Sequence, residues 1–483
     1  MVAFRTAVLL CLIASFSVSS ASPLRPAAPQ NATAVVAAAT ALLARVLPVA
    51  HAAAFAVEYV AQDTATGHEV LEYEATADAA ATITLRGSSA VAVASALNWY
   101  LKNEVRVFAA RSWSALPPFE ADALPNLPLP LPKAKRRMVR PVRFSWYANV
   151  CTASYSHVWW NWTRWEQEID LMALQGVNIM YAHTGTEYVQ AKVWTALLGP
   201  NATRGIADYF VGPAFLAWFR MGNIKKWGGP MPATFLAKQH QLQLQILPRL
   251  HSLGIIGVLP AFAGFVPDAL RYAYPNASIR TGSLWMQSSE YSGVDVLAAT
   301  DPLFSRIGAM FIEGYRSAYS SSAYSLQHFY SADSFNENSP ASGNASYLHD
   351  YAAATHRAMT SVDVEAVWVL QAWAFGSNGW TDASVGAYLS GVSNSSMLLL
   401  DLVSDQMPLW DGAWASLHSL LPGQCCTDEA GWAVNASCVN CPGKCCDPAT
   451  TQGPWMALAA THTYQNYYGK AWVFCSLNNY GGG

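Results

Sequence analysis

The feature that most constrains the fold of this chain is an alternation that begins near residue 140. Short runs rich in β-branched and aromatic residues alternate with amphipathic stretches of helical length, a pattern typical of βα units around a parallel sheet. Seven runs qualify as strands: Val142–Tyr147, Val177–His183, Ile255–Pro260, Gln327–Asp333, Ala366–Trp373, Met397–Leu402 and Ala471–Leu477.

Seven βα units without a glycine-rich phosphate loop favour a TIM-type (β/α)₈ barrel over a doubly wound sheet. The eighth strand has no candidate, so we expect an α/β fold with an incomplete barrel of about seven units. A closed barrel has no strand edges, whereas seven units leave two edges exposed. The sequence therefore predicts a barrel that is not closed and that is destabilised by its two exposed strand edges.

Two of the intervening helices carry clear terminal signals. Thr163 and Glu166 have the spacing of a capping box, and Gly176 is placed to end that helix. A later helix is predicted from about Pro232 to Leu253, stopping before Gly254.

The region before the barrel is predicted to be a small α/β domain over residues 23–114. Its expected elements are an alanine-rich helix, two strands and a second helix, at Ala34–Leu47, Phe55–Tyr59, Thr82–Arg86 and Ser89–Glu104. Repeated prolines remove backbone donors and fix φ, so residues 115–133 are interpreted as an extended linker. The barrel domain is expected to occupy residues 134–483.

The first 21 residues have the order of a secretory signal peptide, with Arg5, an apolar run from Ala7 to Phe16 and then small residues. We expect cleavage near Ala21 or Ser22. The apolar run is shorter than the ~20 residues that a bilayer span needs, so a membrane anchor is disfavoured. Seven N-glycosylation sequons fit the secretory pathway, with a lysosomal or extracellular destination: Asn31, Asn161, Asn201, Asn276, Asn344, Asn394 and Asn435.

Charge and cysteine content restrict the partners. The net charge is −3 and only 12% of residues are charged, against a usual ~25%, so neither nucleic-acid binding nor a polybasic membrane surface is indicated. Six cysteines crowd into one stretch, about residues 411–455: Cys425, Cys426, Cys438, Cys441, Cys445 and Cys446. Zinc could bind there, but an oxidising compartment favours disulfides, with the pairing left open. No metal or other cofactor is expected.

Carboxylates at predicted strand ends suggest glycoside chemistry. Cleavage of a glycosidic bond needs one protonated and one ionised carboxyl group on either side of the bond. The segment "YSADSFNEN" places Asp333 at the end of a strand and Glu337 just beyond it, where barrel enzymes keep catalytic groups. Asn336 could bind a sugar substituent beside the reacting carbon. A solvated acid on a loop is the alternative interpretation of Glu337.

Longer stretches sharpen this hypothesis. The segments "YANVCTASYSHVWWNWTRWEQEIDLMALQGVN", "GPAFLAWFRMGN", "LPAFAGFVP" and "EAVWVLQAWAF" closely resemble the α-N-acetylglucosaminidases of glycoside hydrolase family 89. The similarity covers roughly residues 30 to 410 and the last dozen residues. It implies a retaining exo-hydrolase that releases terminal α-linked N-acetylglucosamine from heparan-sulfate-type glycans.

The resemblance also implies roles for particular residues. Glu337 in "FNEN" matches the acid/base of the family. Residues that line the sugar pocket are matched by Asn149, Cys151, Tyr155, Trp218, Trp285, Asn336 and Trp373. Core packing is an equally good interpretation of each tryptophan. Cys151 could instead pair with Cys475, although a thiol in the pocket is favoured.

Three departures from the family affect the prediction. The segment from His183 to Glu187 replaces a Trp-Ser-Gly-Gln-Glu type sequence, and His183 is interpreted as a buried, satisfied histidine. The cysteine-rich stretch has no counterpart. The final "FCSLNNYGGG" resembles the seventh-strand motif, so we expect the nucleophilic glutamate and a C-terminal helical domain to be absent.

That absence predicts little or no activity for this polypeptide. Asp333, Glu187 and Asp401 lie at or near predicted strand ends, but none matches the nucleophile of the family. The alternative function is a non-catalytic glycan-binding protein that kept the aromatic pocket.

Overall fold

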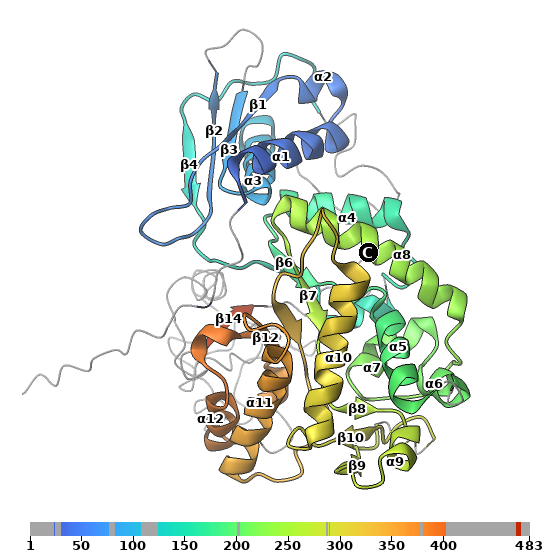
Figure 1. The fold of residues 1–483 in the computed structure, drawn as a ribbon. Helices are drawn as coiled ribbons and strands as arrows, with labels where there is room; N and C mark the ends of the chain where they lie inside the picture. Colours follow the sequence, from blue (N-terminus) through green and yellow to red (C-terminus); the bar gives the residue numbers. More distant parts are fainter. Residues whose placement is uncertain are drawn as a thin grey trace, which may run out of the picture.

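A computed structural model describes most of the chain as a small unit above a larger βα unit (Figure 1). The described residues are 24, 30–76, 83–107, 124–155, 157–199, 203–285, 288, 290–376, 380–401 and 470–474. The predicted signal peptide, the cysteine-rich stretch, Cys475 and residues 115–123 of the predicted linker lie outside these residues.

The upper unit is a four-stranded sheet covered by helices. Its strands are β1 (Phe55–Tyr59), β2 (Val70–Ala75), β3 (Ile83–Gly87) and β4 (Arg136–Val139), and its helices are α1 (Ala32–Val46), α2 (Val49–Ala52) and α3 (Ala90–Tyr100), the last extended by a π-helical turn at Leu101–Val105. The spatial order is β1-β3-β2-β4, with β1 and β3 parallel and the other pairs antiparallel. Both predicted strands and both predicted helices are present.

Strand β4 corrects one boundary. The sequence assigns everything after residue 133 to the barrel, but Arg136 and Arg137 pair with β2 of the upper sheet. Glu72, the residue opposite Arg137, is buried and accepts a hydrogen bond from Arg137 at 2.7 Å. Because of these charged residues, the sequences of β2 and β4 resemble polar loops. For this reason neither strand was predicted.

The larger unit contains one seven-stranded sheet in which all six neighbouring pairs are parallel. Its order is β5-β6-β7-β11-β12-β13-β14. The strands are β5 (Trp146–Tyr147), β6 (Ile179–Tyr181), β7 (Ile256–Pro260), β11 (Phe329–Ser331), β12 (Val367–Gln371), β13 (Met397–Asp401) and β14 (Ala471–Phe474). Each lies inside one of the seven predicted runs, so the incomplete (β/α)₈ barrel is confirmed.

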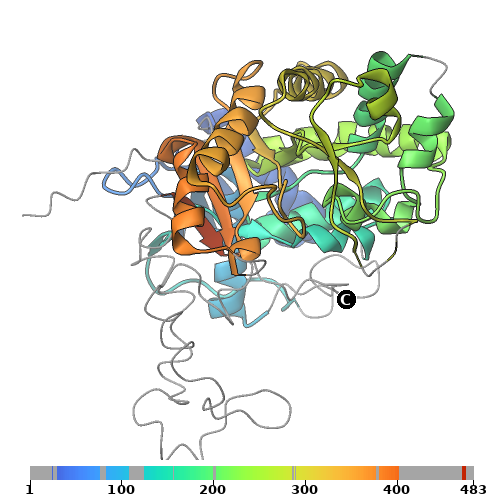
Figure 2. The same ribbon diagram turned by 90° about the horizontal axis from the view of Figure 1, so that it is seen from below.

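Helices surround this sheet. They are α4 (Trp162–Leu174), α5 (Thr186–Leu198), α6 (Thr203–Tyr209), α7 (Leu216–Arg220), α8 (Ala233–Leu253), α9 (Ala269–Ala273), α10 (Pro302–Tyr319), α11 (Ala345–Thr360) and α12 (Asp382–Ser390). Viewed from below, the orange and red segments β12–β14 lie on one side of the barrel and the green segments on the other (Figure 2). None of the helices in the described ranges is both long and apolar enough to span a bilayer.

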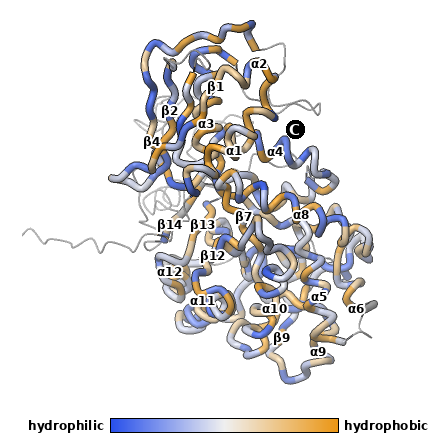
Figure 3. Tube along the Cα trace, turned by 45° about the horizontal axis from the view of Figure 1, so that its top comes forward, coloured by the Kyte–Doolittle hydropathy of each residue, from blue (hydrophilic) through white to orange (hydrophobic). Residues whose placement is uncertain are grey.

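Alternate residues of the barrel strands β6, β11, β12 and β13 face two different cores. Leu398 and Leu400 point into an inner cluster, while Leu399 between them packs with the helices outside. The helices alternate between hydrophobic and hydrophilic colour along their length, as expected for segments with one face on a core (Figure 3). The inner cluster also contains Leu24, whose carbonyl accepts a hydrogen bond from Arg143 Nη1 at 2.8 Å.

A short antiparallel sheet was not predicted. Its strands are β8 (Phe265–Val266), β9 (Ile279–Thr281) and β10 (Asp295–Leu297), in the order β8-β10-β9. Strands of two or three residues are too short to show an alternating pattern, so periodicity gives no signal for them.

Asparagines begin several helices. The Oδ1 atoms of Asn31, Asn161 and Asn344 accept backbone N–H groups at the starts of α1, α4 and α11. The predicted capping box at Thr163 is therefore wrong, because α4 already begins at Trp162 with Asn161 as its cap. Asparagine is at least as good an N-cap as threonine, and moving the cap from Thr163 to Asn161 makes the helix two residues longer. The predicted ends at Gly176 and Gly254 are confirmed.

The two units are joined by polar contacts at α1, α3, α4 and α8. Arg45 makes two hydrogen bonds to Asp170, both of 2.7 Å. Gln30 Nε2 donates to the Ser252 carbonyl at 2.7 Å, and Asn98 Nδ2 donates to the Leu174 carbonyl at 3.0 Å. The upper unit is thereby fixed against the outer helices of the barrel.

A histidine at the start of β11 gives the fold a pH-dependent contact. His328 Nδ1 lies 2.8 Å from both carboxylate oxygens of Asp363. This hydrogen bond raises the pKa of His328, although partial burial opposes it. Because the pKa of His328 is higher in the folded than in the unfolded protein, the protonated imidazole stabilises the fold. This stabilisation is fully present below the unfolded pKa of ~6.5 and is lost as the pH rises through the folded pKa.

We therefore predict that His328→Gln lowers the melting temperature more at pH 5.5 than at pH 8.5. The difference should correspond to no more than about 1 kcal/mol, because the imidazole is 44% exposed. His349, which contacts Ser390 rather than a carboxylate, provides the control substitution His349→Gln. Equal losses at both pH values for His328→Gln would contradict the assignment.

Candidate functional site

Glu337 lies on the loop after β11, at the C-terminal ends of the barrel strands. Phe335 anchors this loop, since its ring is 5% exposed and contacts Tyr351 of α11 and Tyr388 of α12, with centroids 4.7 and 5.6 Å apart. The backbone N–H of Asn336 donates to the Asp333 carbonyl at 3.3 Å. The buried ring fixes the loop, and Glu337 follows it as a half-buried side chain.

An asparagine not selected from the sequence holds this carboxyl group. Asn223 Nδ2 donates a hydrogen bond to Glu337 Oε2. Asn223 is 2% exposed, and its Oδ1 is buried with no hydrogen-bond partner in the described part of the chain. In the sequence, Asn223 is indicated only by its position after Gly222 at the end of a short helix. It belongs to the motif "GPAFLAWFRMGN", from which the sequence analysis selected only Trp218.

Asn336 is oriented by a tryptophan from the next strand. Trp373 Nε1 donates to Asn336 Oδ1 at 3.0 Å. Asn336 is 2% exposed, and its Nδ2 has no hydrogen-bond partner among the described residues. An unpaired buried donor costs free energy unless a ligand or water satisfies it. Asn336 therefore presents an amide NH₂ group of fixed orientation on the residue before Glu337.

Three predicted pocket residues form an aromatic wall. The ring centroid of Trp218 lies 5.8 Å from that of Tyr155 and 6.3 Å from that of Trp285. Cys151 packs in a small apolar cluster against which Trp218 lies. The Trp218 carbonyl accepts the backbone N–H of Asn223 at 2.9 Å, so the wall and the holder of Glu337 belong to one short segment. Tyr155 is 46% exposed, which leaves part of the wall open to solvent.

Asn149 has a structural role that the sequence did not predict. Its Oδ1 accepts the backbone N–H groups of Cys151 at 2.9 Å and of Thr152 at 3.3 Å, which starts the 3₁₀ turn η3 (Val150–Ser154). The residue is 4% exposed. Asn149 thus places the backbone on which Cys151 and Tyr155 lie.

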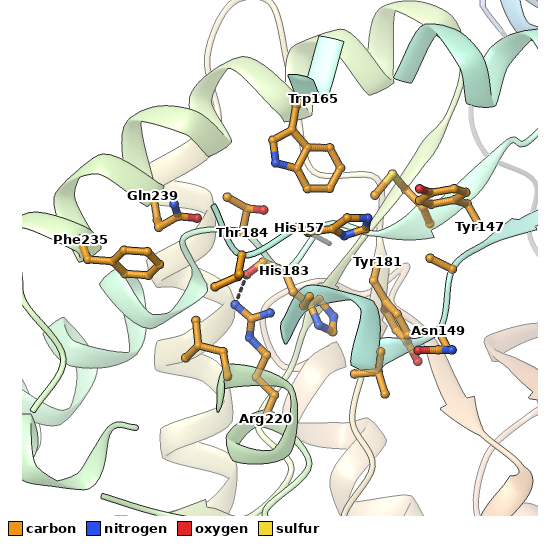
Figure 4. A pocket seen from close by; sticks show the side chains of 16 residues that line it. Tyr147, Asn149, His157, Trp165, Tyr181, His183, Thr184, Arg220, Phe235 and Gln239 are labelled. Carbon is orange, nitrogen blue, oxygen red and sulfur yellow. Dashed lines mark hydrogen bonds between the residues drawn. The ribbon is translucent and has the colours of Figure 1, made fainter. Parts of the chain in front are cut away.

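A cavity lies beside Asn149, with about 570 Å³ of space between protein atoms when the open solvent at its mouth is included. Figure 4 shows its lining, in which Asn149 and Tyr181 lie on one side and Phe235 and Gln239 on the other. A second cavity of about 610 Å³ shares His183 and Arg220 with it and is lined in part by Asp333. Glu337 lines neither of these two cavities.

The histidine between the two cavities is buried, as predicted. His183 is 9% exposed, and its Nε2 lies 3.0 Å from Ser331 Oγ. Burial and the neighbouring Arg220 guanidinium hold its pKa well below the ordinary value. His183 is therefore neutral at physiological pH and is not a proton donor there.

Arg220 and Glu187 form a buried ion pair next to this histidine. Arg220 Nε donates to Glu187 Oε1 at 2.7 Å, and Arg220 Nη2 donates to the His183 carbonyl at 2.9 Å (Figure 4). The two side chains are 8% and 3% exposed. Glu187 is in the first turn of α5 and is bound to Arg220, so it is a structural carboxylate.

Asp333 is held by the neighbouring strand. Its two carboxylate oxygens accept the backbone N–H of Gln371 at 2.8 Å and the Gln371 side-chain amide at 2.9 Å. Burial raises the pKa of Asp333 to about 6, although these hydrogen bonds oppose the shift. Asp333 therefore links β11 to β12 below the loop that carries Glu337.

The remaining candidates give no metal site. In the ranges that the structure describes, no three histidine, cysteine, aspartate or glutamate side chains gather closely enough to hold a metal ion. Asp401 ends β13 and is fully buried. Cys151 is also buried, whereas its suggested partner Cys475 lies outside the described residues.

Comparison with known families gives two matches. A model described as the TIM-barrel domain of alpha-N-acetylglucosaminidase matches residues 145–418, and a model described as the N-terminal domain of that family matches residues 37–132. A human alpha-N-acetylglucosaminidase is 38% identical over 397 residues, which is 79% of this chain and 51% of the human protein. This chain spans about half the length of that relative.

Solved structures show the same fold. A family 89 glycoside hydrolase from Clostridium perfringens, in complex with 2-acetamido-1,2-dideoxynojirmycin, superimposes with a TM-score of 0.68 at 23% identity, over 80% of this chain and 41% of that one. A complex of the same hydrolase with PUGNAc gives the same TM-score at 22% identity, with the same coverage.

The Arg220–Glu187 pair generates a stability prediction. Arg220→Met leaves the Glu187 carboxylate buried without its partner and should lower the free energy of unfolding by about 3–5 kcal/mol. Urea denaturation followed by circular dichroism measures this loss. Combining it with Glu187→Leu should recover most of the stability. A loss below about 1 kcal/mol in the single variant would show that the pair is not an essential contact.

Proposed function

This chain belongs to the alpha-N-acetylglucosaminidase family, and from that premise we propose that its barrel mouth binds a terminal α-linked N-acetylglucosamine, with Glu337 as the acid/base. One observation carries the proposal. Glu337 stands at the C-terminal ends of parallel strands, is hydrogen-bonded to Asn223, and follows Asn336, whose buried amide N–H is unpaired. Barrel enzymes place catalytic groups at this edge of the sheet.

Aromatic rings and amides supply the sugar contacts in this proposal. Flat rings stack on the apolar faces of a sugar, and amides bind its hydroxyl and acetamido groups. The proposed pocket consists of Asn149, Cys151, Tyr155, Trp218, Trp285, Asn336 and Trp373. The Asn336 Nδ2 group donates to the acetamido oxygen, while Trp373 fixes the orientation of that amide. In support, the Clostridium hydrolase has been solved with the acetamido compound 2-acetamido-1,2-dideoxynojirmycin and with its substrate GlcNAc-α-1,4-galactose.

The proposed reaction is exo-hydrolysis with retention of configuration. Glu337 gives its proton to the departing glycosidic oxygen as the bond from that oxygen to the anomeric carbon breaks. A second carboxylate attacks the anomeric carbon, and Glu337 then takes a proton from the water that releases the sugar. We do not assign the attacking role to Asp333 or Glu187, because Gln371 and Arg220 already bind them.

We further propose a heparan-sulfate-type glycan as the substrate and a place in the secretory pathway, either lysosomal or extracellular. The predicted signal peptide and the sequons support this location. Neither a nucleic acid nor a membrane is a proposed partner.

A non-catalytic glycan-binding protein is the second candidate. It is favoured by the positions of the described strand-end carboxylates: Asp333 and Glu187 are engaged by protein groups, and Asp401 is fully buried. The aromatic wall and the amides need no second carboxylate in order to bind a sugar. An assay with an α-linked chromogenic N-acetylglucosaminide distinguishes the two functions. A non-catalytic protein binds N-acetylglucosamine but releases no chromophore from this substrate.

In a version of this protein that spans the full length of its family relatives, Glu337→Gln tests the catalytic assignment, because the present chain spans about half of that length and is expected to have little or no turnover of its own. The amide keeps the shape of the side chain but cannot donate the acid proton, so turnover should fall by about 10²–10⁴-fold. Calorimetric binding of N-acetylglucosamine should change little. Turnover equal to that of the unsubstituted protein would remove Glu337 from the mechanism.

A further inference from the structure

We propose that Asn223 positions Glu337 and reads the acetamido group of the substrate. Its amide N–H holds the Glu337 carboxyl group, while its amide oxygen accepts the acetamido N–H of the bound sugar. This inference rests on the proposed function and adds to it a residue that determines specificity.

The backbone around Asn223 is fixed by its local sequence. Helix α7 ends at Arg220, and Gly222 then adopts a left-handed conformation with φ of +73°. A Cβ atom at Gly222 would lie 2.1 Å from the Phe265 ring, so only glycine fits there. The turn is completed by the hydrogen bond from Asn223 N–H to the Trp218 carbonyl, at 2.9 Å. Asn223 is thus delivered in one orientation.

The side chain of Asn223 uses half of its hydrogen-bonding capacity. Nδ2 donates to Glu337 Oε2, whereas Oδ1 is buried and without a partner in the described residues. Leaving an amide oxygen unpaired at 2% exposure is costly in a folded protein. A substrate donor would remove that cost at the moment of binding.

The buried amide atoms near Glu337 that lack a partner among the described residues match one chemical group. Asn336 Nδ2 is a buried donor on the residue before Glu337, and Asn223 Oδ1 is a buried acceptor on the amide that binds the Glu337 carboxyl group. A secondary amide offers one acceptor and one donor, so a 2-acetamido substituent can pair with both atoms. A hydroxyl group at that position is smaller than the two-ended acetamido group and cannot span two separate amides in the same way.

Few charged groups accompany Glu337 on the elements around it. In the described residues they include Asp333 on its own loop, Arg220 on α7, Lys225 and Lys226 with their shared ion-pair partner Asp268, and Arg280 on β9. Gln371 binds Asp333, and Arg280 Nη2 donates to the Ser339 carbonyl at 2.8 Å. A substitution at Asn223 therefore changes a contact of Glu337 without disturbing an ion pair.

Calorimetric titration of the full chain with N-acetylglucosamine, from pH 4.5 to pH 8, tests the inference. Asn223→Ala should weaken binding by about tenfold or more, as expected for the loss of a buried hydrogen bond. Asn98→Ala is the matched control, since Asn98 also donates through Nδ2 while its Oδ1 is buried and unpaired. Asn98 lies on α3, away from the barrel mouth, and its substitution should change binding by less than about twofold.

Asn223→Asp supplies a readout that a purely structural role would not give. It keeps the acceptor oxygen but sets a second carboxylate against Glu337, so binding should weaken near pH 8 and recover toward pH 4.5, where the two groups share a proton. The unsubstituted protein should show no such recovery. Circular dichroism verifies that each variant is folded. If Asn223→Ala does not fold, the pH profile of the nearly isosteric Asn223→Asp tests the role of Asn223.

The outcomes separate the two proposals. Binding by Asn223→Ala within about twofold of the unsubstituted protein, with a flat pH profile for Asn223→Asp, would overturn the role of Asn223 and leave the proposed function standing. If the unsubstituted chain does not bind N-acetylglucosamine, the proposed function fails and the inference fails with it.

Discussion

The parallel pairing of seven strands determines where each functional group of this chain lies. Tyr330 of β11 pairs with Leu259 of β7 on one side and with Trp368 of β12 on the other. The C-terminal ends of these strands therefore reach the same edge, and their loops meet there. A slip of one residue in any pair would exchange its inward and outward side chains, so the register that fills the inner core also aims the loop of Glu337.

The barrel could be predicted because its strands are buried on both faces and so appear as short apolar runs. Met397–Asp401 is buried at every position, and this run is visible without a structure. Strand β2 was missed for the opposite reason, since Glu72 and Glu74 interrupt its apolar pattern. Their charges are compensated by Arg137, 65 positions from Glu72, and by Arg86, 12 positions from Glu74, so each partner lies on a different strand. A buried strand can therefore be predicted from its apolar residues, whereas a strand with paired charges cannot be predicted without knowing which residues lie opposite.

The site was predictable only in part. The family resemblance selected Tyr155, Trp218 and Trp285, and the structure brings their rings into contact. The roles of these residues stay proposals. Asn223 could not be predicted, because its partner Glu337 is 114 positions away and nothing local to either residue records their contact. Within the same motif, the sequence analysis selected Trp218, because a large aromatic side chain suggests the wall of a pocket.

The asparagine caps bear on how sugar attachment to this chain can be studied. Asn31, Asn161 and Asn344 each belong to an N-glycosylation triplet and also begin a helix through Oδ1. An N-linked glycan is joined through the side-chain nitrogen, so one residue can carry an oligosaccharide and hold a helix end together. Replacing any of these asparagines to delete a glycan would also loosen a helix start. Altering the hydroxyl residue two positions later, such as Thr163 within α4, removes the attachment signal and keeps the cap.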